Sequence, residues 1–123
     1  MPNHVSFEND LMLLTSRVLT LKRQNRVAEL SKNQTKLIYA LMNKVNDKSL
    51  LIGYIWPAQD IKRKQSSYSQ LVFQTRLLLK ENNFPPDFII TLPGYGLCLN
   101  TAFLVRTKTA MTSGMYISPE LIA

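Results

Sequence analysis

The chain has 123 residues, of which 46% are hydrophobic, and 15 lysines and arginines against 8 acidic residues give it a net charge of +7. This size and apolar content suffice for one domain whose core needs no disulfide staples. The single cysteine, Cys98, has no partner for an internal disulfide, which fits a reducing compartment.

Neither a membrane span nor a signal peptide is visible. No segment approaches the roughly twenty consecutive apolar residues that cross a bilayer, and the N-terminus lacks the charged and apolar regions of a signal peptide. The sequence therefore predicts a cytoplasmic protein, or the cytoplasmic part of a membrane-anchored one if the chain continues past Ala123.

The basic residues are concentrated in the first two thirds of the chain. Residues 1–80 hold thirteen basic and five acidic side chains, whereas residues 81–123 hold two and three. A local positive surface favours a polyanion such as nucleic acid or anionic lipid, although many basic proteins carry only a solvated face.

The N-terminal third contains short β-like runs at residues 5–7, 11–15, 18–22 and 26–30. Their alternation predicts a small antiparallel sheet with Leu19, Leu21 and Val27 directed inward. Residues 11–14 fit one helical turn equally well.

Three helices are expected next. Ser31 and Gln34 form a capping box, and the first helix then carries an apolar stripe: Leu37, Ile38, Leu41, Met42 and Val45. A second helix begins at residues 48–49 and is stopped by Pro57, with Trp56 as a core anchor. After a basic linker over residues 58–65, a third helix begins near Ser66, and its core stripe comprises Leu71, Val72, Thr75, Leu78 and Leu79.

Residues 87–100 predict a β-hairpin. Ile89, Thr91, Leu97 and Leu99 alternate as in half-buried strands, and the turn between them reads Pro-Gly-Tyr-Gly, which would break a helix. The glycines at positions 94 and 96 are expected to serve backbone geometry. A helix followed by such a hairpin suggests DNA binding.

Three motifs, in this order, resemble the OmpR/PhoB-type winged-helix effector domains. Residues 27–41 read Val-Ala-Glu-Leu-Ser-Lys-Asn-Gln-Thr-Lys-Leu-Ile-Tyr-Ala-Leu and are similar to the family's entry into its first helix. Ile55-Trp56 matches the Val-Trp that ends the family's second helix. Residues 89–99, Ile-Ile-Thr-Leu-Pro-Gly-Tyr-Gly-Leu-Cys-Leu, resemble its wing pattern Ile-x-Thr-Val-x-Gly-x-Gly-Tyr-x-Leu.

The resemblance implies an α+β fold, a winged helix-turn-helix with an N-terminal antiparallel sheet, three helices and a C-terminal β-hairpin wing over residues 1–100. For residues 101–123 we expect an extra strand over residues 102–105, followed by a flexible tail or linker. Because no receiver domain precedes this fold, the chain is most similar in organisation to the ToxR/CadC branch of bacterial one-component transcription regulators.

In this family the third helix, here residues 66–80, enters the major groove, and the wing, here residues 91–97, touches the flanking backbone or minor groove. Double-stranded DNA is therefore the expected partner, with two copies on tandem half-sites and contact with RNA polymerase or a second regulator as further expectations. The residues expected to contact DNA are Lys48, Lys62, Arg63, Lys64, Ser67, Tyr68, Gln70, Gln74, Arg76, Lys80, Thr91 and Tyr95.

Several of these residues have a simpler interpretation. The cations at 62–64 fit phosphate contacts or a solvated loop, and Gln70 and Gln74 fit adenine contacts or an ordinary helix surface. Arg76 fits a phosphate or guanine contact, or a pair with Glu81. Phe73 and Leu77 are apolar on the face expected to meet DNA, which a thymine-methyl contact, a protein partner or a rotated helix would each explain.

Two further classes of function remain as alternatives: a degenerate winged helix that binds another regulator, and, less well supported, a basic membrane-surface protein. Catalysis is not expected, because the lone His4 and Cys98 offer no nucleophile with an activating base. One Cys and one His cannot supply a zinc site, and no phosphate loop or dinucleotide motif is present. The sequence therefore predicts no enzyme activity, no cofactor, no metal and no small-molecule substrate.

Overall fold

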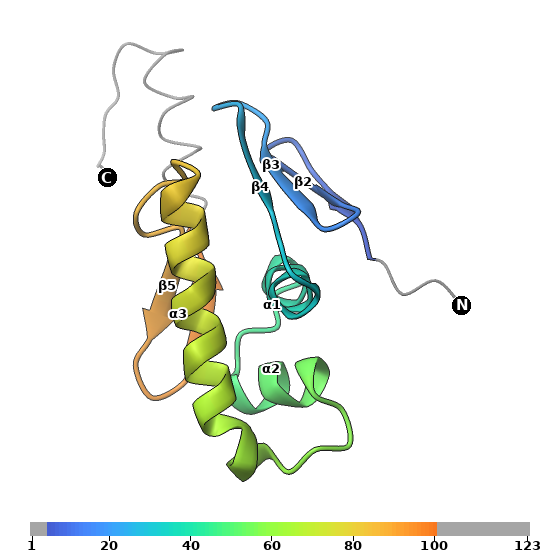
Figure 1. Cartoon of the computed structure of the whole chain (residues 1–123), viewed down its shortest axis with the longest axis vertical. Helices are drawn as coiled ribbons and strands as arrows, with labels where there is room; N and C mark the ends of the chain where they lie inside the picture. The colour runs from blue at the N-terminus through green and yellow to red at the C-terminus, as the bar shows by residue number, and fades with distance from the viewer. Residues whose placement is uncertain (1–4, 101–123) are drawn as a thin grey trace.

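The computed structural model of the chain describes residues 5–100 (Figure 1). The extra strand and tail expected in 101–123, and His4, lie outside the described residues. In the part that is described, no helix has the length and apolar character needed to span a membrane.

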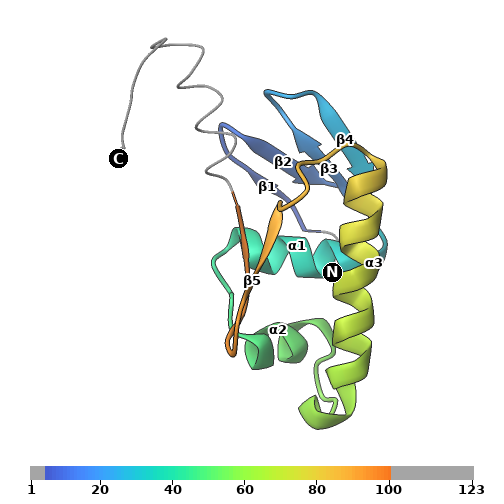
Figure 2. The same cartoon turned by 90° about the vertical axis from the view of Figure 1, so that its left-hand side faces the viewer.

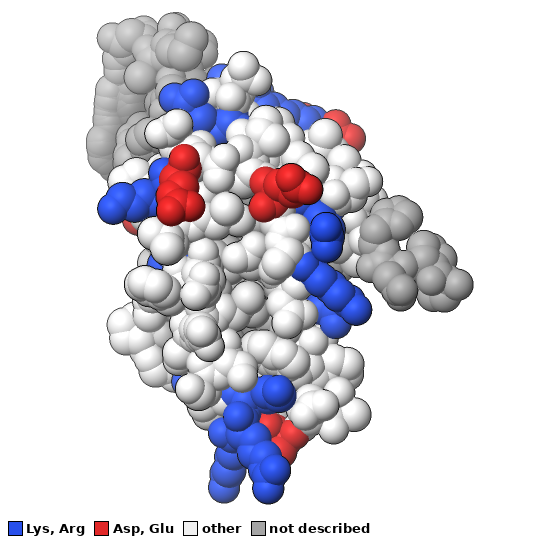
Figure 3. Space-filling view, viewed as in Figure 1, with Lys and Arg blue, Asp and Glu red and all other residues white. Residues whose placement is uncertain are grey.

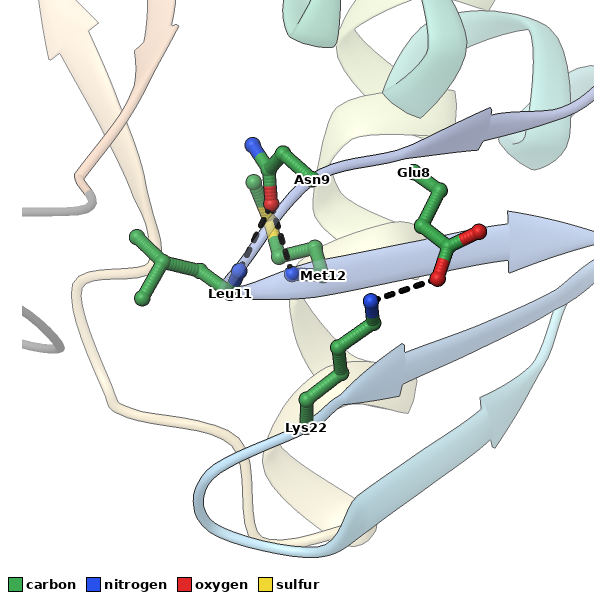
Figure 4. Close-up of polar contacts among 5 residues, drawn as sticks. All are labelled: Glu8, Asn9, Leu11, Met12 and Lys22. Carbon is green, nitrogen blue, oxygen red and sulfur yellow. Dashed lines mark hydrogen bonds and ion pairs between the residues drawn. The ribbon is translucent and has the colours of Figure 1, made fainter.

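The N-terminal residues form a four-stranded antiparallel sheet in the order β1 (Phe7–Glu8), β2 (Met12–Thr15), β3 (Val18–Leu21) and β4 (Arg26–Glu29). Residues 12–14 are thus in a strand and not in a helical turn. The turn before β2 is closed by the Asn9 side chain, whose Oδ1 accepts from the backbone N–H groups of Leu11 and Met12, each at 2.8 Å (Figure 4). Lys22, just after β3, pairs with Glu8 at 2.6 Å across the sheet (Figure 4).

One inward residue of this sheet was predicted wrongly. Leu19 and Leu21 are buried as expected, but Val27 is 48% exposed and its neighbour Ala28 is buried instead. The β3–β4 register pairs Leu19 with Ala28 and Thr20 with Val27. Since strand side chains alternate between faces, this register places Val27 with Thr20 on the outer face.

The first two helices begin as their local sequence predicts. α1 (Lys32–Met42) has the expected capping box: the Gln34 N–H donates to Ser31 Oγ at 3.2 Å, and the Ser31 N–H donates to Gln34 Oε1 at 2.8 Å. α2 (Lys48–Ile55) is capped by Asp47, which accepts from the Leu50 N–H, and it ends just before Trp56-Pro57. Trp56 itself is half-buried and packs against the core.

The α2–α3 connection is more ordered than the linker predicted from the sequence. Asp60 accepts from the Lys62 N–H and opens a short 3-10 helix, η1 (Ile61–Lys64), which continues directly into α3 (Gln65–Glu81). The buried residues of α3 are Tyr68, Val72, Thr75 and Leu79. Thr75 is fully buried, and its hydroxyl donates to the Leu71 carbonyl at 2.7 Å, so the buried polar group has a hydrogen-bond partner.

The C-terminal hairpin joins β5 (Ile89–Leu92) to β6 (Gly96–Leu99). Gly94 lies at its turn with a φ of +73°, in the left-handed region that favours glycine. Of the four alternating residues expected to be half-buried, Ile89 and Leu97 are buried and Leu99 is half-buried, but Thr91 is exposed. Cys98 is half-buried.

These elements enclose one core, which the sheet covers at one end (Figures 1 and 2). α1 runs beneath the sheet, α3 runs along one flank, and the hairpin lies against α1 and α2 (Figure 2). The predicted α+β class, with its four-stranded antiparallel sheet, its helices and its C-terminal hairpin, is confirmed.

Candidate nucleic-acid interface

A groove of about 620 Å³ lies between the start of α2, the middle of α3 and the hairpin. It brings together five of the residues predicted to contact DNA: Lys48, Tyr68, Arg76, Thr91 and Tyr95. These positions are spread over half of the described chain, so it is the tertiary fold that brings their side chains together in one groove.

The hairpin is fixed to the connection between α1 and α2 by backbone pairing. The Leu97 N–H donates to the Asn46 carbonyl at 3.0 Å, and the Lys48 N–H donates to the Tyr95 carbonyl at 2.8 Å. The Asn46 side chain adds a bond to the Leu97 carbonyl at 2.8 Å. Gly96 is buried at this junction, and a Cβ on it would lie 1.8 Å from the Asn46 carbonyl oxygen. Glycine is therefore required there for close approach and not for its dihedral freedom.

Arg76 ties α3 to the other strand of the hairpin. Its Nη2 donates to the Thr91 hydroxyl at 2.7 Å and to the Ile89 carbonyl at 3.1 Å. The pairing with Glu81 considered from the sequence is absent, since the guanidinium points to the hairpin instead. α3 and the hairpin are thus held as one unit, with Arg76 and Thr91 occupied in their joint.

Tyr68 is only 6% exposed, so most of its ring is unavailable to a ligand. The Lys48 ammonium lies 5.4 Å from the ring centroid, within cation–π range, and the ring thereby supports the lysine at the mouth of the groove. Burial raises the pKa of the Tyr68 phenol above the ordinary 10.0; nearby Arg76 lowers this pKa and Asp47 raises it.

The raised pKa of Tyr68 predicts a loss of stability in alkali. Because the folded state holds the phenolic proton more tightly than the unfolded state, this contribution is complete below pH 10.0 and is lost as pH rises above that value. Chemical denaturation across this range should show a smaller alkaline loss for Tyr68→Phe than for the parent. The pKa of Tyr54 is also raised, by burial and by Tyr39. Tyr54 therefore adds to the loss of stability in alkali, and Tyr54→Phe should remove that part of the loss. Identical pH profiles for Tyr68→Phe and the parent would contradict the assignment.

The exposed side of α3 carries amides, hydroxyls and large apolar groups. Its exposed members between the first and last turns are Ser69, Gln70, Phe73, Gln74 and Leu77, followed by Lys80 in the last turn. Ser67 is half-buried. Phe73 is 64% exposed and Leu77 is 42% exposed, so the helix is not rotated in a way that buries them.

Cations gather at the start of α3. Lys62 and Arg63 are exposed on η1, and the Lys64 ammonium lies 5.6 Å from the centroid of the Trp56 ring. Within residues 5–100 none of the three forms an ion pair. Figure 3 shows this basic cluster at the foot of the molecule, where the α2–α3 connection lies in Figure 1. Such a cluster can neutralise phosphates.

A second basic hollow, of about 510 Å³, was not predicted. It is lined by Arg17, Lys32 and Lys36 together with Tyr54, between the β2–β3 turn and α1. Figure 3 shows a separate group of basic side chains at the right of the view, near the position of α1 in Figure 1. The sequence did not indicate that Asn46 and Gly96 hold the hairpin against the α1–α2 connection. The local signals were only a polar residue ahead of a helix and a glycine in a turn, and neither identifies a partner distant in sequence.

Within the described residues, no cluster of three or more His, Cys, Asp or Glu side chains is arranged to hold a metal ion. Comparison of the sequence with protein-family models and with curated proteins finds no match.

Proposed function

We propose that the chain is a cytoplasmic transcription regulator whose winged helix-turn-helix binds double-stranded DNA at specific sequences. α3 enters the major groove, and the hairpin, as the wing, contacts the flanking backbone or minor groove. Two copies on tandem half-sites about 10 base pairs apart would face the same side of the duplex, and RNA polymerase or a second regulator is the further partner.

The observation that carries this proposal is a surface of three joined parts: an exposed helix, a cation cluster at its start and a hairpin fixed to its flank. α3 has 17 residues, which corresponds to a length of about 25 Å. A helix of this kind fits the B-DNA major groove, which is about 12 Å wide. Because Arg76 fixes the hairpin to α3, both elements meet the duplex in a set geometry.

The surface divides into residues that position the protein and residues that read bases. Cations at both ends of α3 and at the start of α2 contact phosphates, and these are Lys48, Lys62, Arg63, Lys64 and Lys80. Ser67, Gln70 and Gln74 face base edges. Tyr95, 53% exposed at the hairpin turn, contacts the flanking backbone. Tyr68 and the Arg76–Thr91 pair do not contact DNA. The Tyr68 ring positions Lys48, and the Arg76–Thr91 hydrogen bond holds the hairpin on α3.

The proposal is tested by selecting duplexes from a random-sequence pool with the full chain, then titrating a labelled winner in fluorescence anisotropy at several salt concentrations. We expect saturable binding, enrichment of a defined site, and a steep negative slope of log affinity against log salt. Gln74→Ala should relax specificity at one base pair, while Lys62→Ala should weaken all sequences alike. Absence of binding to any duplex at low salt would refute the proposal.

A second candidate function is a protein-interaction module that modulates another regulator. The exposed apolar side chains of Phe73, Leu77 and Tyr95 favour it, since soluble surfaces rarely gather large apolar groups without a partner. The same duplex titration separates the two functions, because a module of this kind would retain no saturable, salt-dependent DNA binding.

A further inference from the structure

We infer that the base pairs read by α3 are A·T pairs, with thymine methyl groups packed on Phe73 and Leu77 and adenine edges paired with Gln70 and Gln74. This inference rests on the proposed DNA binding and adds the sequence class that the same surface recognises. It follows from what the exposed side of α3 presents and from what it lacks.

The apolar pair is the first argument. Phe73 and Leu77 are four residues apart, so they are neighbours on one side of the helix, and both are exposed. In the major groove thymine presents a methyl group and the other DNA bases present no such group, so thymine is the apolar target available to these side chains. A guanine or cytosine edge would instead leave its polar groups facing a phenyl ring and an isobutyl group without hydrogen-bond partners.

The amide pair is the second argument. Gln70 and Gln74 are also four residues apart and exposed. Each precedes one member of the apolar pair by three residues, Gln70 before Phe73 and Gln74 before Leu77, so the amides lie beside the apolar side chains on the helix surface. A glutamine amide matches the N6 donor and N7 acceptor of adenine bidentately. One A·T pair therefore offers an adenine edge to an amide and a thymine methyl to an apolar side chain.

The third argument is that α3 itself carries no free arginine for guanine. Guanine is recognised best by a guanidinium fork that donates to both O6 and N7. Arg76 is the only cation between residues 65 and 79 of the chain, and its Nη2 is already donating to Thr91 and Ile89. Both forks of a guanidinium, Nη1 with Nη2 and Nε with Nη2, include this nitrogen, so neither is complete for guanine.

The charge distribution agrees with this division of roles. Figure 3 shows basic side chains at the foot of the molecule, while the middle of the same face, over which α3 runs in Figure 1, is mostly white, with only small blue areas at its edge. Phosphate affinity thus comes from the ends of α3, and sequence preference comes from its uncharged middle.

The test replaces individual thymines of the selected duplex with deoxyuridine, which removes the methyl group and leaves base pairing intact. For the parent protein, affinity should fall about fourfold for each contacted methyl, the transfer free energy of one buried methyl expressed as an affinity ratio. Phe73→Ala should abolish the difference at one thymine. Val27→Ala is the matched control, because Val27 is an exposed apolar residue on the sheet, and it should retain the full difference.

Three results would overturn the inference while leaving DNA binding intact. These are a selected core with guanines at the positions protected by α3, equal affinity for thymine and deoxyuridine duplexes, or an unchanged thymine preference in Phe73→Ala. The second of these results, if an A·T preference is still present, would mean that the preference arises from groove shape and not from α3 contacts. Loss of all duplex binding would refute the proposed function itself.

Discussion

Gly96→Ala is expected to lower the free energy of unfolding by about 2–3 kcal/mol, at the upper end of what overpacking a buried site costs. A Cβ at this position would lie 1.8 Å from the Asn46 carbonyl oxygen and 2.9 Å from the Lys48 backbone nitrogen. Both atoms belong to backbone that is paired with the hairpin, so they cannot move away without breaking the bonds of Lys48 and Leu97. The hairpin should therefore detach from the α1–α2 connection.

Urea denaturation measures the stability change, and amide hydrogen exchange at Lys48 and Leu97 reports the detachment. Gly53→Ala is the matched control: it lies inside α2, nothing surrounds its Cβ position within 4 Å, and the change should stabilise the protein by about 0.5–1 kcal/mol. If Gly96→Ala unfolds at the same urea concentration as the parent, the hairpin does not pack closely against the α1–α2 connection and the prediction is wrong. DNA affinity should fall with detachment, because the hairpin would no longer flank α3.

Replacing Lys62, Arg63 and Lys64 with alanine together is expected to reduce the negative salt slope of DNA binding by about 2.7, since each phosphate contact contributes about 0.9. The three residues lie on η1 at the start of α3, and none is held by an ion pair within the described chain. Affinity should fall for all sequences alike, because phosphate contacts carry no base information. Anisotropy titrations of selected and unrelated duplexes at several salt concentrations measure both effects.

The chain offers a control with the same change in charge. Substituting Arg17, Lys32 and Lys36, which line the other basic hollow, also removes three positive charges but does so away from α3. This variant should retain most of the salt slope. If both triple variants lose the slope equally, binding depends on net charge alone, and the assignment of phosphate contacts to η1 is wrong.

Local sequence signals predicted the elements of this fold because each signal acts within one turn of the chain. The Ser31–Gln34 capping box starts α1 where expected, and Pro57 follows the end of α2. The Pro-Gly-Tyr-Gly turn connects β5 to β6, which pair antiparallel as a hairpin where the sequence predicts one. Short-range hydrogen bonding and steric exclusion determine these boundaries, so the residues concerned are close in sequence.

The candidate site was predictable only in part. Exposed positions of α3 such as Gln70 and Gln74 followed from helical spacing, since the apolar stripe identifies the opposite side. The linker containing Lys62 was expected to be irregular, yet the Asp60 cap orders it as η1. An aspartate two residues ahead of the cations was the signal that could have indicated this turn.

The sequence by itself determined the order of the strands, helices and hairpin, the starts of α1 and α2, and the cations that flank α3. The tertiary structure alone decided which strand face holds Val27, that Tyr68 is buried beside Lys48, and that Arg76 binds the hairpin. It also decided that Gly96 touches the backbone of Asn46. The physical reason is that capping and turn energies depend on neighbours a few residues away, whereas strand register, helix rotation and hairpin docking depend on contacts between segments distant in sequence.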